Sequence, residues 1–210
     1  MEFGNFEIEC DVDTTQAYHD KYNEQCECDE CTHFRRHFNS TYPITAKMLM
    51  KFGINIMYPL EIMDFGFTTK ESMREYCVYF SVKGNLPVDK IESNLGELPI
   101  TLRNWNIANE AYGNTGMDVP YFIIEVSNIF LKDVKGEFYE AVNHGREIEF
   151  TYKDKHYFES RHGDNDWYIY CEETRIMQRF KSSDDLLLGT ILDGESINNI
   201  WEDIMIDCIL

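Results

Sequence analysis

The residues best suited to chemistry lie near the start of the chain, where Cys26, Cys28 and Cys31 stand within six positions. Two residues separate Cys28 from Cys31, a spacing that lets neighbouring thiolates share one tetrahedral ion. His33 and His37 follow at an interval of four, so a helix would place them on one face. Three thiolates and one imidazole complete a structural zinc site. A zinc ion at this cluster is therefore one candidate interpretation of the sequence.

Other interpretations of the cysteine cluster stay open. Zinc modules usually show two separated ligand pairs, and no second pair follows here, although Cys10 or Cys77 could supply a fourth ligand. Acidic and amide residues crowd positions 24–30. Their charges should raise the pKa of the thiols, which disfavours a redox-active cysteine. The interpretation that the sequence favours is plain thiols, half-buried at the start of a helix.

Motifs for catalysis are missing from the sequence. It contains no Gly-x-Ser-x-Gly elbow and no glycine-rich phosphate-binding loop. Asp164 and Asp166 lie in a Gly-Asp-Asn-Asp stretch without the ligand spacing of a calcium loop, so a solvated turn is expected there. We therefore expect a protein that works by binding and not as an enzyme.

The charge balance limits the kind of partner. The chain has 19 Lys and Arg against 38 Asp and Glu, a formal net charge of −19, and both ends of the chain share the excess. Such a surface repels phosphate backbones and attracts a cationic protein. The sequence thus predicts no direct nucleic-acid binding and favours a basic, nucleic-acid-binding protein as partner. The alternative is that the acidity serves solubility alone.

A second candidate binding surface lies near the C-terminus, in the predicted strand 167–171. Its odd positions are expected to face the core, which leaves two tyrosines on the other face, flanked by acids. Tyrosines beside acids are suited to anchoring a basic partner. Alternatively, helices cover that face and Trp167 is exposed. The predicted partner-binding residues are Tyr168, Tyr170, Asp164, Asp166, Glu172 and Glu173.

The elements that position these residues fall into two predicted modules, 1–143 and 144–210, in an α+β chain. The first is mixed, with a short helical segment carrying the cysteines. Its helices are expected at 13–23, capped by Asp13, and at 31–38 and 43–52. The segment 132–145 is expected to be either a linker or a short helix that closes this module. Strands are expected at 3–12, 75–82, 98–105 (an edge, because of Pro99) and 121–131 (central), with a loop at 106–120.

The second module reads as a four-strand antiparallel meander covered by two helices. Strands are expected at 148–152, 156–160, 167–171 and 175–180, joined by short turns. Ser182 or Ser183 caps the first helix, and Ser196 caps a final helix. In that final helix Ile197, Ile200, Trp201 and Ile204 fall at the spacing of one buried face.

The compartment is predicted to be the cytoplasm. The chain shows no leader-like start and no apolar run long enough to cross a bilayer, so no membrane association is expected. Its seven cysteines are an odd number, which fits thiols or metal ligands better than a disulfide framework.

Two stretches resemble a group of uncharacterised acidic bacterial proteins. The first is Cys-x-Cys-x-x-Cys-x-x-Phe with Tyr42-Pro43 and Phe52-Gly53 after it; the second is the tail, with 148–153, Trp167-Tyr168, 193–196 and Ile200-Trp201. Such proteins look like cargo of mobile elements, where immunity proteins and inhibitors of defence nucleases are common. The resemblance and the charge imply an acidic inhibitor of a basic nucleic-acid-processing protein, either a nuclease toxin or a CRISPR-type nuclease. The alternative is a zinc-stabilised structural or regulatory interaction module.

Overall fold

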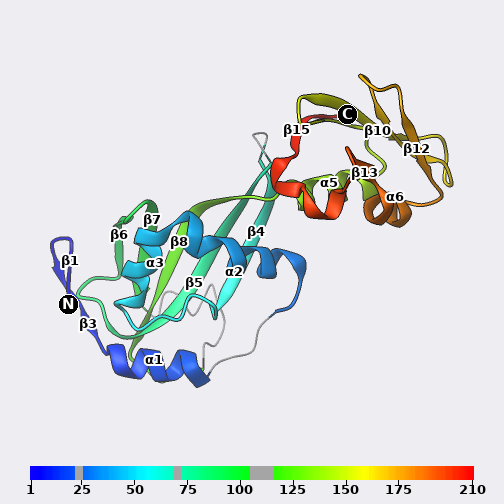
Figure 1. Ribbon diagram of the computed structural model, residues 1–210. Coiled ribbons are helices and arrows are strands. Elements are labelled where there is room, and N and C mark those ends of the chain that lie inside the picture. Colours follow the sequence, from blue (N-terminus) through cyan, green and yellow to red (C-terminus); the bar gives the residue numbers. More distant parts are fainter. Residues whose placement is uncertain (22–25, 69–71, 105–115) are drawn as a thin grey trace. The chain divides into compact units, whose positions relative to one another are not determined.

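The computed structural model of the protein describes residues 1–21, 26–68, 72–104 and 116–210 (Figure 1). Trp105 and most of the predicted loop 106–120 lie outside these ranges, as does the end of the helix predicted at 13–23. The described residues combine helices with antiparallel strands, so the α+β class is confirmed. Contacts divide the chain into two compact units, 1–66 with 74–131 and 67–73 with 132–210. In the described residues, no helix is both long enough and apolar enough to span a membrane.

The first unit is built on a six-stranded sheet in the order β3-β5-β8-β7-β6, with β4 also paired to β5. A small hairpin of β1 (Glu2–Phe3) and β2 (Phe6–Glu7) precedes it. The strands of the sheet are β3 (Glu9–Cys10), β4 (Glu61–Phe67), β5 (Met73–Asn85), β6 (Lys90–Leu95), β7 (Leu98–Asn104) and β8 (Tyr121–Lys132).

Strands β5 and β8, at the centre of this sheet, are buried on both faces. Side chains alternate across a strand, and each face of the sheet is covered. In β5, Tyr76, Val78, Phe80 and Val82 belong to the main core, as predicted. The intervening Cys77 and Tyr79 join a smaller cluster on the other face, together with Tyr121 and Ile123 of β8. The prediction of a central strand at 121–131 is thereby confirmed.

Helices α2 (Asp29–Thr41) and α3 (Pro43–Met50) lie across one face of this sheet (Figure 1). Phe34 and Phe38, one turn apart on α2, are fully buried in the main core. Pro43 opens α3, and Gly53 after it has a φ of +81°, as its predicted role in ending the helix requires.

Three predictions for the first unit are corrected. The strand predicted at 3–12 is a hairpin and a short third strand, because Gly4, with φ at +59°, turns the chain. Helix α1 (Val12–Lys21) is capped by Asp11 and not Asp13, since the Asp11 carboxylate accepts hydrogen bonds from the backbone and hydroxyl of Thr14. Strand β7 is internal, because Pro99 lies next to the β6–β7 turn, opposite Asn94.

The second unit holds a five-stranded antiparallel sheet in the order β12-β11-β10-β9-β15. The first four strands form the predicted meander, and the turn Lys153-Asp154 has the positive φ values of a tight hairpin. Helix α6 (Ser183–Gly189) is capped by the Ser182 hydroxyl, as predicted. The strands are β9 (Ile148–Tyr152), β10 (Lys155–Arg161), β11 (Trp167–Cys171), β12 (Met177–Phe180) and β15 (Met205–Ile209).

Two predictions for this part of the chain are corrected. Segment 132–145 contains helix α5 (Val134–Asn143), whose buried residues, Phe138 among them, pack into the core of the second unit and not the first. In place of the predicted final helix, the structure has two single 3₁₀ turns, Ile197–Asn199 and Trp201–Asp203, before β15. A short hairpin of β13 (Ile191–Leu192) and β14 (Glu195–Ser196) precedes these turns. The four apolar residues predicted to be buried there are buried.

Trp201 packs against the rings of Phe138 and Tyr139 at centroid distances of 5.3 and 5.8 Å. We expect Trp201→Ala to lower the free energy of unfolding by about 3–5 kcal/mol, the usual cost of removing a large buried aromatic. Chemical denaturation followed by circular dichroism measures this. Leu188→Ala, at a residue that is 70% exposed in α6, is the control and should change little. Equal effects of the two variants would contradict the packing.

Glu159 is an ionisable residue inside the core of the second unit. It is fully buried in β10, between Ile148 on β9 and Ile169 on β11. In the described part of the chain, neither of its carboxylate oxygens has a hydrogen-bond partner. Burial, reinforced by the charge of Glu147, raises the pKa of Glu159 to about 8. The carboxyl is therefore protonated in the folded protein near neutral pH.

The raised pKa makes stability depend on pH. An unfolded glutamate loses its proton near the ordinary glutamate pKa of 4.5, whereas folded Glu159 keeps it until about pH 8. The folded state then binds more protons in this window, so the stability contributed by Glu159 falls as pH rises from 4.5 to 8. We expect Glu159→Gln to gain stability over the wild type by up to about 1.4 kcal/mol per pH unit in this range. Denaturation at several pH values tests this, and Glu149→Gln, at an exposed position of β9, should show no such trend.

Candidate metal centre

The start of helix α2 brings the three cysteines together. Cys28 is the N-cap residue, with an extended backbone, and its sulfur accepts a hydrogen bond from the Cys31 backbone at 3.5 Å. One helical turn therefore places Cys28 and Cys31 side by side. The Arg35 guanidinium donates to the Cys26 carbonyl oxygen and ties the preceding segment to the helix. As a result, the sulfurs of Cys26, Cys28 and Cys31 all lie within 4.8 Å of one another.

This separation is close to what a metal ion needs. Zinc–sulfur bonds of about 2.3 Å at tetrahedral angles hold sulfurs about 3.8 Å apart. Cys26 and Cys28 are exposed and Cys31 is half-buried, so small side-chain rotations can close the remaining gap. All seven cysteines of the chain are free thiols. The predicted grouping of the three cysteines is therefore present.

The three thiols differ in acidity. Burial raises the pKa of Cys28, and raises that of Cys31 to about 12 with help from the neighbouring thiols. The pKa of Cys26 is lowered, chiefly because the Cys28 backbone N–H donates to its sulfur. The expected rise in pKa thus occurs at two of the thiols, with burial and not the nearby acids as its main cause. Metal binding must displace these protons, so affinity should increase with pH.

The two histidines do not join the sulfurs. Residues two apart on a helix point to different sides, so His33 faces away from Cys31. His33 Nδ1 lies 2.9 Å from the Tyr76 hydroxyl on β5, and the centroids of the His33 and His37 rings are 4.5 Å apart, with the rings tilted by 35°. Among the described residues, neither histidine belongs to the metal-ligand group. The structure does not bring either histidine to the sulfurs, and a fourth ligand from His33 or His37 stays a prediction.

The other proposed fourth ligands are also elsewhere. Cys77 is buried on the far face of the sheet, in the cluster with Tyr79. Cys10 lies with its sulfur 3.9 Å from the Phe52 carbonyl oxygen, and burial raises its pKa to about 11. The described residues therefore offer three sulfur ligands at this centre and leave a fourth position to a ligand from outside it.

A buried arginine fixes the start of α2 on the sheet. Arg74 of β5 is 9% exposed, and its guanidinium donates to both carboxylate oxygens of Asp64 on β4, at 2.9 and 2.6 Å. Glu30, in the first turn of α2, approaches the same guanidinium at 3.6 Å. Burial opposes the charge on Asp64, but Arg74 holds the pKa of that carboxyl below its usual range.

The same ionic group reaches the cysteines. The pKa of Glu30 is lowered, first by its own backbone N–H and then by the Cys28 thiol. A chain of polar contacts thus runs from Asp64 through Arg74 and Glu30 to Cys28. Sequence reasoning missed it, because nothing local shows that 64 and 74 meet 30. Its one visible sign in the sequence is an arginine directly before the strand predicted at 75–82.

The predicted partner-binding tyrosines lie on β11, in the five-stranded sheet of the second unit. As predicted, Trp167, Ile169 and Cys171 face the core, and the tyrosines face the other way. Tyr168 is nevertheless only 8% exposed. The rings of Phe158 and His162 pack on it at 6.3 and 5.0 Å, and the Arg179 guanidinium lies 5.8 Å from its centroid. Tyr170 is half-buried, and its hydroxyl accepts a hydrogen bond from Arg175.

The acids of this surface are partly neutralised. Asp166 forms a 2.6 Å ion pair with Arg179. Glu173 accepts hydrogen bonds from the His156 backbone and from the Cys171 thiol, so it is held toward the core face of β11. Asp164 and Glu172 are exposed. The six predicted residues therefore do not form one continuous acidic surface, and two arginines lie among them.

No protein-family model matches the chain, and no curated protein or solved structure matches it either. The centre on α2 therefore rests on its own geometry.

Proposed function

We propose that this protein is a metal-stabilised interaction module, in which Cys26, Cys28 and Cys31 hold a zinc ion at the start of α2. The observation that carries this proposal is the approach of the three sulfurs to within 4.8 Å of one another. Thiolates are preferred ligands of zinc, and of the softer first-row metals in general. The positive end of the α2 dipole lies at Cys28 and opposes the rise in thiol pKa that burial causes there.

Bound zinc would join the segment before α2 to its first turn. Three bonds to one ion would hold Cys26 against the helix, in addition to the Arg35 contact and the hydrogen bond from the Cys28 backbone. Since an ion that binds only the folded state adds to its stability, zinc would stabilise the first unit. A fourth position filled by water or by a residue of another molecule would keep the ion open to a partner.

The zinc proposal predicts a specific pattern of ligand loss. The purified chain should bind about one zinc per molecule, measured by elemental analysis, and cobalt should give thiolate charge-transfer absorption. Cys28→Ser should lower metal affinity by at least about 10–100-fold, because even outer partners of metal ligands contribute that much. Cys208→Ser, an exposed cysteine of the second unit, is the matched control.

His37→Ala separates this arrangement from the Cys₃His site expected from sequence. Because His37 contacts the His33 ring and does not belong to the sulfur group, its loss should leave metal affinity unchanged. A large loss in His37→Ala would place the histidine in the coordination sphere. Absence of thiolate absorption in the wild-type chain would remove the metal proposal.

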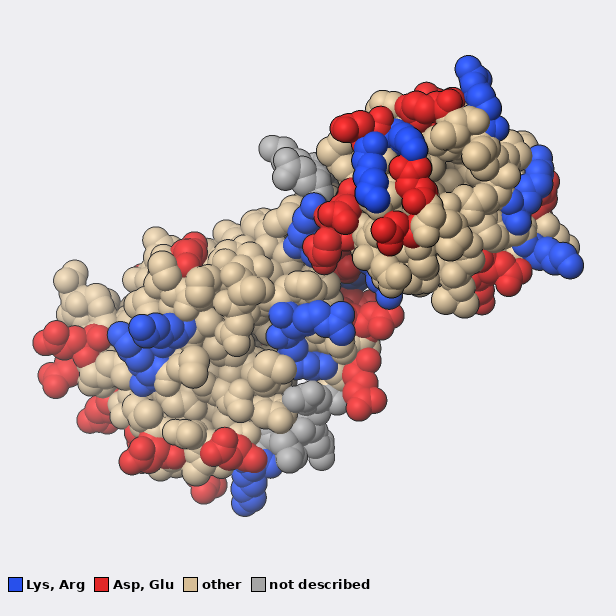
Figure 2. Space-filling model, viewed as in Figure 1, with Lys and Arg blue, Asp and Glu red and all other residues tan. Residues whose placement is uncertain are grey.

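We also propose that the chain binds a basic, nucleic-acid-processing protein as an inhibitor, of the immunity or anti-defence kind that its sequence resembles. The observation in favour is the charge of −19, with 12 basic and 23 acidic residues in 1–143 and 7 and 15 in 144–210. In the face that Figure 2 shows, acidic side chains (red) lie beside basic ones (blue) on both units. The attraction is then a property of the summed field, which steers a cationic partner toward the chain.

Charge steering predicts a strong salt effect on association. Raising salt from about 50 to 500 mM shortens the Debye length from about 14 to about 4 Å. Association with a basic nuclease captured by the chain should therefore slow far more than dissociation accelerates, as measured by surface plasmon resonance. A partner that is neutral or acidic, or an association rate indifferent to salt, would contradict the inhibitor proposal and leave the acidity to solubility.

A further inference from the structure

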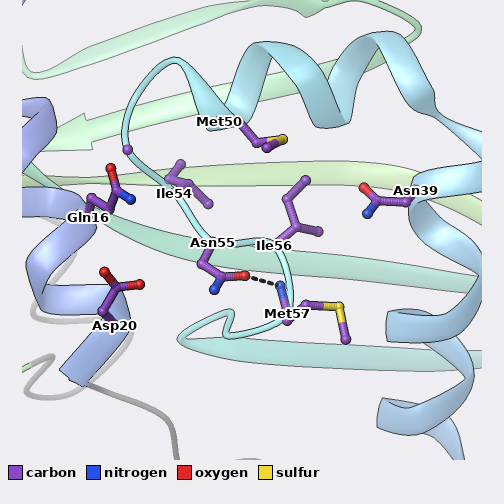
Figure 3. A pocket seen from close by; sticks show the side chains of 9 residues that line it. Gln16, Asp20, Asn39, Met50, Ile54, Asn55, Ile56 and Met57 are labelled. Atoms are coloured by element: carbon purple, nitrogen blue, oxygen red, sulfur yellow. Dashed lines mark hydrogen bonds between the residues drawn. The ribbon is translucent and has the colours of Figure 1, made fainter.

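A pocket of about 310 Å³ lies in the first unit, on the side where its three helices meet. Its walls come from parts of the chain that are distant in sequence. Gln16 and Asp20 of α1 line one side, Asn39 of α2 the opposite side, and Met50 of α3 lies above Met57 of the following segment (Figure 3). None of these residues belongs to the cysteine centre or to the predicted tyrosine surface.

Backbone geometry creates this pocket. At Gly53 the chain leaves α3 with a φ of +81° and passes so close to α1 that a Cβ would lie 2.3 Å from the Val12 carbonyl oxygen. Only glycine fits there. The segment that follows puts Ile54 and Ile56 into the pocket lining, at 3% and 5% exposure, and they give it an apolar floor.

The chemistry of the lining is one-sided. Asp20 is exposed and is the only charged side chain among the described lining residues, which include no Lys, Arg or His. The other polar groups are the amides of Gln16, Asn39 and Asn55, and Asn55 is oriented by accepting a hydrogen bond from the Met57 backbone at 3.1 Å. Met50 and Met57 are 61% and 39% exposed. Methionine is unbranched and flexible, and it adapts to the shape of an apolar guest.

We propose that this pocket binds an ammonium or guanidinium group carried on an aliphatic chain, the chemistry of a lysine or arginine side chain of the partner. The aliphatic part packs between the methionines and the isoleucine floor. The cation meets the Asp20 carboxylate and the amide oxygens. This inference rests on the proposed binding of a basic protein and gives that partner an anchor point.

The charge of the pocket lining, and its difference from the tyrosine surface of the second unit, favour a cation as the ligand. A lining with one carboxylate and no base repels anions and leaves the carboxylate open to a positive charge. At the tyrosine surface of the second unit, by contrast, Arg175 and Arg179 already contact Tyr170 and Tyr168. A partner's lysine would have to displace an arginine there, whereas no basic residue lines this pocket within the part of the chain that the structure describes.

A small probe tests the pocket without the partner. The full chain, with ¹³C-labelled methionine methyls, is titrated with Nα-acetyl-lysine methylamide and followed by nuclear magnetic resonance. The Met50 and Met57 methyl signals should shift and saturate together. The Nε-acetylated form of the same probe, which has the chain without the charge, should bind about two- to fivefold more weakly, the contribution of a partly exposed ion pair.

Two charge-neutralising variants on one helix sharpen the result. Asp20→Asn should weaken the lysine probe by the same factor as acetylation and remove the preference for the charged form. Asp13→Asn, at an exposed position of α1 that does not line the pocket, should bind like the wild type. Absent or non-saturating methyl shifts, equal binding of both probes, or equal effects of the two variants would overturn the proposal.

Measurements with the partner distinguish failure of the pocket from failure of the inhibitor proposal. If Asp20→Asn associates with a captured basic protein as the wild type does, with an unchanged salt dependence, the pocket is not its anchor and the inhibitor proposal still stands. If the lysine probe binds as expected but no basic partner is captured, the pocket stands as a cation site and the inhibitor proposal fails.

Discussion

A buried guanidinium organises the first unit. Arg74 is buried near the start of β5, and removing such a charge from water is costly unless carboxylates meet it. Asp64 meets it from the adjacent strand, and Glu30 approaches it from the first turn of α2. The Glu30 contact therefore helps to hold the start of the helix at this point of the sheet. The N-cap residue of that helix is Cys28, so the same contact helps to position the sulfur cluster.

Much of the fold was predictable where one periodicity excluded the others. Alternation in β5 and the double burial of β8 identified those strands, and the four-strand meander followed from short alternating runs between turn residues. The spacing of Ile197, Ile200, Trp201 and Ile204 correctly predicted burial but not a helix. Intervals of three and four suit successive 3₁₀ turns equally well, and the sequence does not distinguish the two. Strand β15 was not predicted; its residues follow directly after the segment that was expected to be a helix.

The candidate centre was predictable only in part, because local spacing shows some of its contacts and not others. Local spacing brings Cys28 and Cys31 together within one turn of helix, and the sequence shows that directly. The same local geometry turns His33 away, which ligand types alone do not show. The Arg74 group depends on pairing between residues ten and more than forty positions apart. The net charge is equally limited as a guide to a binding surface. It does not show that arginines lie among the predicted acids of the second unit.

The order of strands in the second unit has a consequence for how it folds. Strand β9 is the first strand of that sheet in the sequence, and it pairs with β10 beside it and with β15, the last. Closing the β9–β15 pair joins positions more than fifty residues apart, and the entropy of that closure must be overcome before the pair forms. Until then β9 is an open edge lined by Ile148, Phe150 and Tyr152. A chain that lacks β15 keeps that edge permanently, and such edges are templates for strand addition between molecules. Solubility of this unit thus depends on its last strand as well as on its charge.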